Sequence, residues 1–99
     1  MKTFVMLHFG FEKPTPEIMG AWGKWFESIK ENLVDMGHVG FGEGREISSE
    51  GTRDLPLCSD SITGCTVVSA ESLDDAERLA QGNPYIASIR VYEVRTGNC

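Results

Sequence analysis

The 99 residues of this chain leave room for one domain with one core, and we place its bounds at residues 1–99. Hydrophobic residues make up 40% and charged residues 24%, proportions typical of a globular protein and not of a disordered one. The formal net charge of -6 repels phosphate backbones and anionic headgroups, which argues against nucleic acid and membranes as main partners. Three cysteines without a disulfide-framework spacing favour free thiols and a cytoplasmic location.

The N-terminal residues predict a strand followed by a helix. Residues 2–9 are rich in strand-forming side chains, and alternation places Phe4, Met6 and His8 together on one face. Both faces of this strand are largely apolar, so we expect both to be covered. Thr15 as a cap and Pro16 in the first turn then predict the start of a helix.

The first helix is predicted over residues 16–36, with Gly37 as its terminator. Its apolar residues recur mostly at steps of three and four, the period of one helical face. They are Ile18, Trp22, Trp25, Phe26, Ile29, Leu33 and Met36. Gly20 and Gly23 each cost a helix ~1 kcal/mol relative to alanine, so we expect another backbone to approach them closely.

The remaining residues predict three more strands and a second helix. Residues 39–48 are a weak, glycine-interrupted strand, residues 49–61 a polar connection, and residues 62–70 the third strand. Ser72 and Asp75 form a capping-box-like start for a helix that runs through Gln81. Residues 85–95 are predicted to form the fourth strand.

The element order predicts the fold and its assembly. The order βαββαβ is that of an α+β, ferredoxin-like domain, in which two helices cover one face of an antiparallel four-stranded sheet. The other face would remain apolar and uncovered, so we expect a homodimer whose sheets face each other as a dimeric α/β-barrel.

Several short motifs resemble those of the YCII-related proteins, in particular the branch with an Asp-Gly-Pro-Phe signature. The motifs are the run from Asp54 to Leu79, the following Asn-Pro and Glu-Val-Arg, the W-G-K-W of residues 22–25 and the D-M-G of residues 35–37. The resemblance implies a dimeric α/β-barrel, and a few proteins related to that family act on small ring compounds or lactones by cofactor-free proton transfer or elimination. Here the signature is Asp54-Leu55-Pro56-Leu57, without the glycine and phenylalanine.

The resemblance also implies a histidine–aspartate pair that this chain lacks. Asp35 matches the aspartate, but the histidine position falls near Phe26, so acid–base chemistry would need another partner. His8 is the candidate if it projects into the dimer cavity, where desolvation would keep it neutral and basic. It could equally be a strand-end histidine with one hydrogen bond, and Asp35 could equally be a solvated side chain.

Further candidates belong to the predicted polar connection and to the first helix. Asp54 and Asp60 could bind the polar end of a substrate at a cavity rim, or bond to their own backbone. Trp22 and Trp25 belong to the core by default, with the lining of a pocket for an aromatic ligand as the alternative. His8 and His38 with the cysteines have no recognised metal-ligand spacing, so we predict neither a metal site nor a cofactor.

Two functions remain open at this point. The first is a cofactor-independent enzyme that performs proton transfer or elimination on a small, partly apolar molecule, with His8, Asp35 or Asp54 as catalytic residues. The second is a non-catalytic dimeric module that binds a small ligand or a protein partner.

Overall fold

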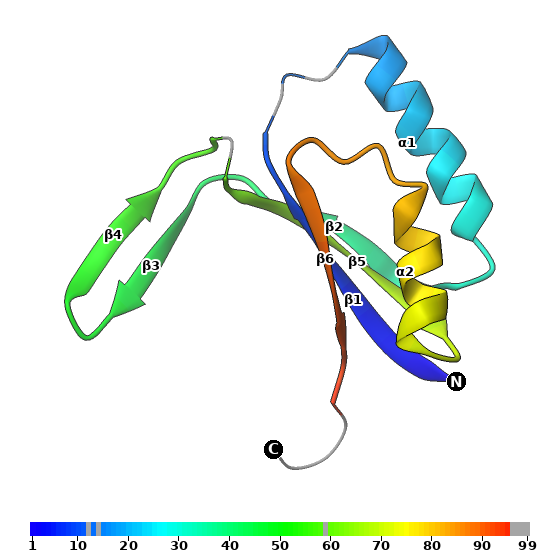
Figure 1. Cartoon of the computed structure of the whole chain (residues 1–99). Helices are drawn as coiled ribbons and strands as arrows, with labels where there is room; N and C mark the ends of the chain where they lie inside the picture. Colours follow the sequence, from blue (N-terminus) through cyan, green and yellow to red (C-terminus); the bar gives the residue numbers. More distant parts are fainter. Residues whose placement is uncertain (12, 14, 59, 96–99) are drawn as a thin grey trace.

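The computed structural model describes residues 1–11, 13, 15–58 and 60–95, leaving out the side chains of residues 35 and 36. Within these residues the elements follow the order β1 (Lys2–Phe9), α1 (Pro16–Ile29), β2 (Leu33–Gly40), β3 (Gly44–Ser48), β4 (Gly51–Leu55), β5 (Ile62–Ala70), α2 (Leu73–Gln81) and β6 (Ser88–Glu93). Four strands form one sheet, while β3 and β4 form a separate hairpin (Figure 1). The predicted α+β class is confirmed.

The main sheet has the strand order β2-β5-β1-β6, and its strand pairs are antiparallel. β1 lies inside this sheet, with Met6 opposite Thr66 of β5 and Val91 of β6. Both described helices lie against the same face (Figure 1). The core lies between that face and the helices and consists of Phe4, Met6, Trp25, Ile29, Val68, Ala70, Ala76 and Ala80.

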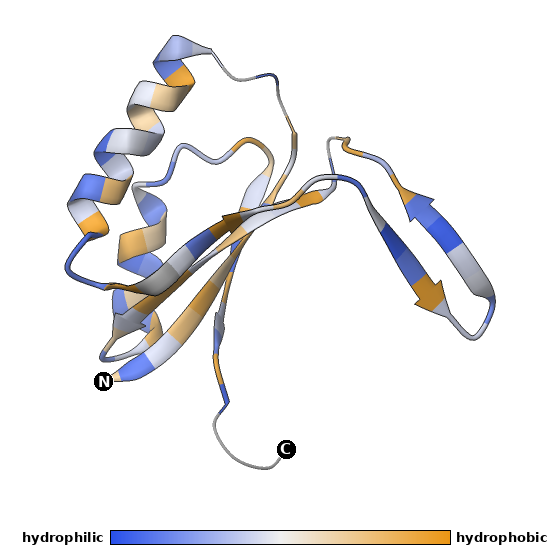
Figure 2. Ribbon diagram, turned by 180° about the vertical axis from the view of Figure 1, so that it is seen from behind, coloured by the Kyte–Doolittle hydropathy of each residue, from blue (hydrophilic) through white to orange (hydrophobic). Residues whose placement is uncertain are grey.

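The opposite face of the sheet, which we call the open face, carries the alternate residues of the strands. Neither described helix covers it, and strands rich in hydrophobic residues run across it (Figures 1 and 2). The only cation–π contact described in the chain lies here, with the Arg90 guanidinium 4.6 Å from the centroid of the Phe9 ring. The open face includes Val5, Leu7 and Phe9 of β1, Cys65 and Val67 of β5, and Arg90 and Tyr92 of β6.

The first helix is shorter than predicted. It begins as expected, with the Thr15 side chain accepting a hydrogen bond from the Ile18 amide, but it ends at Ile29. The chain then turns, and the amide of Ser69 donates to the carbonyl of Asn32 at 2.7 Å. Pairing with β5 therefore takes Leu33 into a strand, although its spacing also suits the helical face.

Gly37 lies within β2 and does not terminate a helix. A Cβ atom at this position would lie 2.5 Å from the carbonyl oxygen of Val34 and 2.9 Å from that of Val67. The pairing of β2 with β5 is irregular between Leu33 and His38, which brings these backbones close together. The glycine is required by this close approach. By contrast, a Cβ at Gly20 or Gly23 would meet nothing within 4 Å, so the expected backbone contact there is wrong.

The β3–β4 hairpin replaces the predicted second strand and polar connection. Residues 39–40 end β2 and residues 44–48 form β3, with residues 41–43 between them, and residues 51–55 pair with β3 instead of forming a loop. All residues of the two strands are exposed, and the hairpin extends away from the main sheet (Figure 1). The middle of both hairpin strands is hydrophilic, whereas the end of β3 is hydrophobic (Figure 2). Gly51 enters β4 with a φ of 121°, a conformation that glycine adopts without strain.

The C-terminal part agrees more closely with the prediction. β5 spans the predicted residues 62–70, and the amide of Asp75 donates to the Ser72 side chain at 3.1 Å where α2 begins. β6 spans Ser88–Glu93 and is therefore shorter than the predicted strand of residues 85–95. Neither described helix combines the length and apolar character that a membrane span needs.

Candidate functional site

A threonine hydroxyl on β5 joins two histidines on the helix-covered face of the sheet. The Oγ1 atom of Thr66 lies 2.7 Å from Nε2 of His8 and 2.8 Å from Nδ1 of His38. β5 lies between β1 and β2, so both neighbouring strands direct a side chain toward Thr66. His38 stands directly opposite Thr66 in the register, and His8 is displaced by one diagonal position.

Aromatic rings of α1 surround the two imidazoles. The ring centroid of Trp22 lies 5.1 Å from that of His8 and 5.8 Å from that of His38. Phe26 lies 4.9 Å from His38 in an edge-to-face arrangement. Trp22 and Phe26 are four residues apart and share one side of the helix, which places both above the same end of the sheet.

These side chains line an open pocket of about 260 Å³ between α1 and the sheet, which we call the histidine pocket. Pockets that hold drug-sized ligands measure roughly 300–1,000 Å³, so this one suits a molecule of about one ring. His8 is only 5% exposed and Thr66 is fully buried, whereas His38 is exposed. His38 is therefore the polar group that a molecule entering the pocket reaches first. The lining residues are His8, Trp22, Phe26, His38, Thr63 and Gly64.

Both histidines are neutral at pH 7. Burial, with a smaller contribution from the neighbouring His38, lowers the pKa of His8 from 6.5 to about 4. Partial burial also lowers the pKa of His38. The site therefore offers uncharged hydrogen-bonding groups among aromatic rings.

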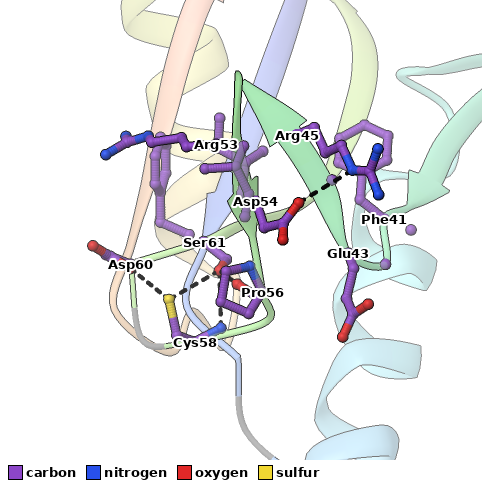
Figure 3. A pocket seen from close by; sticks show the side chains of 15 residues that line it. Phe41, Glu43, Arg45, Arg53, Asp54, Pro56, Cys58, Asp60 and Ser61 are labelled. Atoms are coloured by element: carbon purple, nitrogen blue, oxygen red, sulfur yellow. Dashed lines mark hydrogen bonds and ion pairs between the residues drawn. The ribbon is translucent and has the colours of Figure 1, made fainter. Parts of the chain in front are cut away.

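A second and larger hollow of about 750 Å³ lies where the hairpin joins the sheet (Figure 3). We call it the hairpin cleft. Asp54 lies in β4 and pairs with Arg45 across the hairpin at 3.2 Å. The Cys58 thiol donates a hydrogen bond to Asp60 at 2.7 Å and lies 3.2 Å from the hydroxyl of Ser61. The lining residues of this cleft include Phe9 but none of those that line the histidine pocket.

The structure bears on the expected positions of two candidate residues. His8 does not meet the condition set for it as a base in a dimer cavity, because the helices cover the face that carries Phe4, Met6 and His8. Asp35 was predicted at the end of the first helix, but it lies in β2. Its side chain lies outside the described part of the chain.

The remaining candidates are separated from one another. Trp25 is 3% exposed and belongs to the core, where its indole Nε1 donates to the carbonyl of Leu79 at 2.8 Å. Trp22 lines the histidine pocket, whereas Asp54 and Asp60 line the hairpin cleft. Neither aspartate is therefore brought to His8. The hydrogen-bond partner of the His8 imidazole among the described residues is Thr66.

Thr66, His38 and Phe26 form part of the site, but sequence reasoning did not single them out as ligand contacts. Alternation along β5 does place Thr66 on the same face as Gly64 and Val68. A polar residue within the buried row of a strand was therefore the available signal. No comparable signal identified His38, because its strand had been assigned to the helix and the following segment.

Among the described residues, no group of three or more histidine, cysteine or acidic side chains is arranged to hold a metal ion. Comparisons with known proteins assign no relationship: no protein-family model matches the chain, and no curated protein matches it.

Proposed function

We propose that this protein is a binding module for a small, uncharged, partly apolar ring molecule, which occupies the histidine pocket. The observation that carries the proposal is a one-ring pocket lined by two neutral imidazoles and by the rings of Trp22 and Phe26. Aromatic walls supply apolar and edge-to-face contacts, and the imidazoles supply a small number of oriented polar groups.

Cofactor-independent proton transfer or elimination is the second candidate function. It is favoured by the short contacts of one hydroxyl with two imidazoles, which link two proton-accepting groups. However, a base with a pKa of about 4 has little driving force to remove a proton from a weak acid at neutral pH. For this reason we place binding ahead of catalysis. We also propose, from the motifs of the sequence, that the chain is related to the YCII-related proteins.

The binding proposal can be tested with one-ring probes such as ethylbenzene and acetophenone. Each tryptophan indole gives its own signal in a ¹H–¹⁵N spectrum, so binding should shift the Trp22 signal more than that of Trp25, whose Nε1 donates to Leu79. Trp22→Leu should weaken binding at least tenfold. The matched control is Tyr85→Leu, which alters a half-exposed ring outside the histidine pocket. A lack of response to millimolar probes, or equal binding by both variants, would refute the proposal.

We also propose that the chain forms a cytoplasmic homodimer through the open face. The strand order β2-β5-β1-β6 with two helices on one side supports a ferredoxin-like domain, in which that face requires a partner. Val5, Leu7 and Val67 supply apolar surface at its centre. A second copy would bury this surface and stabilise a domain of only 99 residues, whose single core is small.

Light scattering should therefore give about twice the chain mass of 10.9 kDa at micromolar concentration. Val67→Lys places a charge at the centre of the open face and should produce monomers. Met19→Lys makes the same kind of change on α1, at a residue that is 65% exposed, and should leave the mass unchanged. A folded wild-type monomer would contradict the dimer.

A further inference from the structure

The positions of the protons around Thr66 determine whether the histidine pocket offers a hydrogen-bond donor or an acceptor to a ligand. Among the described hydrogen bonds, Oγ1 of Thr66 has two partners, Nε2 of His8 and Nδ1 of His38. The hydroxyl has one proton to donate, and each neutral imidazole has one N–H and one lone pair. If both imidazoles donated to the two lone pairs of the oxygen, the hydroxyl proton of the fully buried Thr66 would have no partner among the described residues. One histidine therefore donates to the oxygen while the other accepts from it.

Two arrangements pair the hydroxyl proton as well as both ring nitrogens that face Thr66. In the first, Nε2–H of His8 donates to Thr66, and the Thr66 hydroxyl donates to Nδ1 of His38. His38 then has its proton on Nε2, and Nδ1 of His8 carries a lone pair. In the second, every proton is reversed, so His38 presents a lone pair at Nε2 and His8 has an N–H at Nδ1. The tautomers of the two histidines are thus coupled through Thr66.

The buried surroundings of His8 favour the first arrangement. Nδ1 of His8 is buried and has no hydrogen-bond partner among the described residues. A buried N–H without a partner is rarer in proteins than an acceptor with an unused lone pair. The first arrangement also places both imidazoles in the Nε2–H form, which is the more stable tautomer of an isolated histidine side chain. The second places both in the less stable form.

We infer that Thr66 and His8 fix His38 as a hydrogen-bond donor toward the histidine pocket, which thereby selects uncharged ring molecules that carry a hydrogen-bond acceptor. This inference rests on the proposed binding function and names the ligand class for it. Nδ1 of His38 is held by the buried Thr66, which leaves Nε2 as the ring nitrogen available to a ligand. The ligand ring would lie against Trp22 and Phe26 while its acceptor meets this N–H.

His8 and Thr66 are positioning residues in this scheme, because they act on the ligand through His38. No described side chain lining the pocket carries a positive charge at neutral pH. An anionic acceptor such as a carboxylate would therefore lose its hydration without gaining an ion pair. The fitting class is a one-ring ketone, ester, amide or aryl ether.

The test compares three one-ring probes that differ in hydrogen bonding. Acetophenone has an acceptor, ethylbenzene has nearly the same shape without one, and pyrrole has an N–H donor. In the wild-type protein we expect acetophenone to bind about fivefold to tenfold more tightly than ethylbenzene, the gain from one net hydrogen bond. Thr66→Val should abolish this preference, and Thr66→Ser should retain it. Long-range ¹H–¹⁵N spectra of the wild-type imidazoles should show both histidines in the Nε2–H form.

The outcomes separate this inference from the proposal on which it rests. If none of the probes binds, the binding function itself is refuted. If ethylbenzene and acetophenone bind equally well, or if the spectra show Nδ1–H forms, the ring pocket stands and the donor assignment is overturned. The wild-type spectra and Thr66→Ser decide the question even if Thr66→Val does not fold.

Discussion

Lowering the pH from 7 toward 4 should destabilise the protein through His8. The unfolded chain binds a proton at this imidazole with a pKa of 6.5, whereas the folded protein binds it only at about 4. Between these values the unfolded state holds more protons, so the free energy of unfolding falls as the pH falls through this window. At 1.36 kcal/mol per pH unit, the difference amounts to at most about 3 kcal/mol. The lowered pKa of His38 acts in the same direction.

Urea denaturation at a series of pH values measures this effect, with His8→Gln as the comparison. The 15 acidic residues also titrate as the solution becomes acidic, and the variant retains their contribution. The difference in pH dependence between the two proteins therefore isolates the imidazole. His38→Gln should reduce part of the acid-induced loss in the free energy of unfolding. It removes the charge effect of His38, which is the second cause of the low pKa of His8. Parallel pH profiles for the wild type and His8→Gln would refute the reasoning.

Three substitutions test the packing of the fold. Trp25→Ala should lower the free energy of unfolding by about 3–5 kcal/mol in urea titrations, because the ring is buried in the core and its Nε1 hydrogen bond is lost. Gly23→Ala should raise the melting temperature through a gain of up to about 1 kcal/mol, because its Cβ would enter open space on a helix. Gly37→Ala should lower the melting temperature, since its Cβ would lie 2.5 Å from the Val34 carbonyl oxygen. A loss under about 1 kcal/mol for Trp25→Ala, or equal effects at the two glycines, would contradict these assignments.

The elements that sequence reasoning located well have a clear period and clear ends. Buried and less buried residues alternate along β1 up to Gly10, and they alternate along β5 until just before the start of α2. Ser72 caps α2 at the residue where a hydroxyl beside acidic residues predicts a helix start. In these segments the local preference and the tertiary contacts require the same backbone conformation.

The end of the first helix could not be predicted, because two local signals agreed on the wrong answer. Leu33 continues the helical spacing, and Gly37 resembles a helix terminator. Both residues instead serve the pairing of β2 with β5, Leu33 opposite Val68 and Gly37 at a close approach to Val67. Contacts with a strand about 35 residues later in the chain leave no trace in local spacing.

The hairpin was missed for a different reason. Its cross-strand pairs are charged, with Arg45 opposite Asp54 and Glu46 opposite Arg53, and they lack the alternation of apolar and polar residues that marks a half-buried strand. Its two-residue turn is Ser-Glu, without the Asn-Gly or Asp-Gly pair that is the strongest hairpin signal. An exposed hairpin that packs against nothing in its own chain has little hydrophobic pattern to reveal it.

The residues on the two faces of β1 bear on the proposed dimer. Here the helices cover the set that contains His8, and the open face receives the wholly apolar set of Val5, Leu7 and Phe9. Placing His8 under the helices removes a polar ring from water, and its described hydrogen bond with Thr66 offsets this cost only in part, because the buried Nδ1 has no partner among the described residues. A monomer would gain by the opposite choice, since water would reach the imidazole and the helices would cover Leu7 and Phe9. The observed choice is favourable if a second copy covers the open face, and if the buried histidine serves a ligand in the pocket above it.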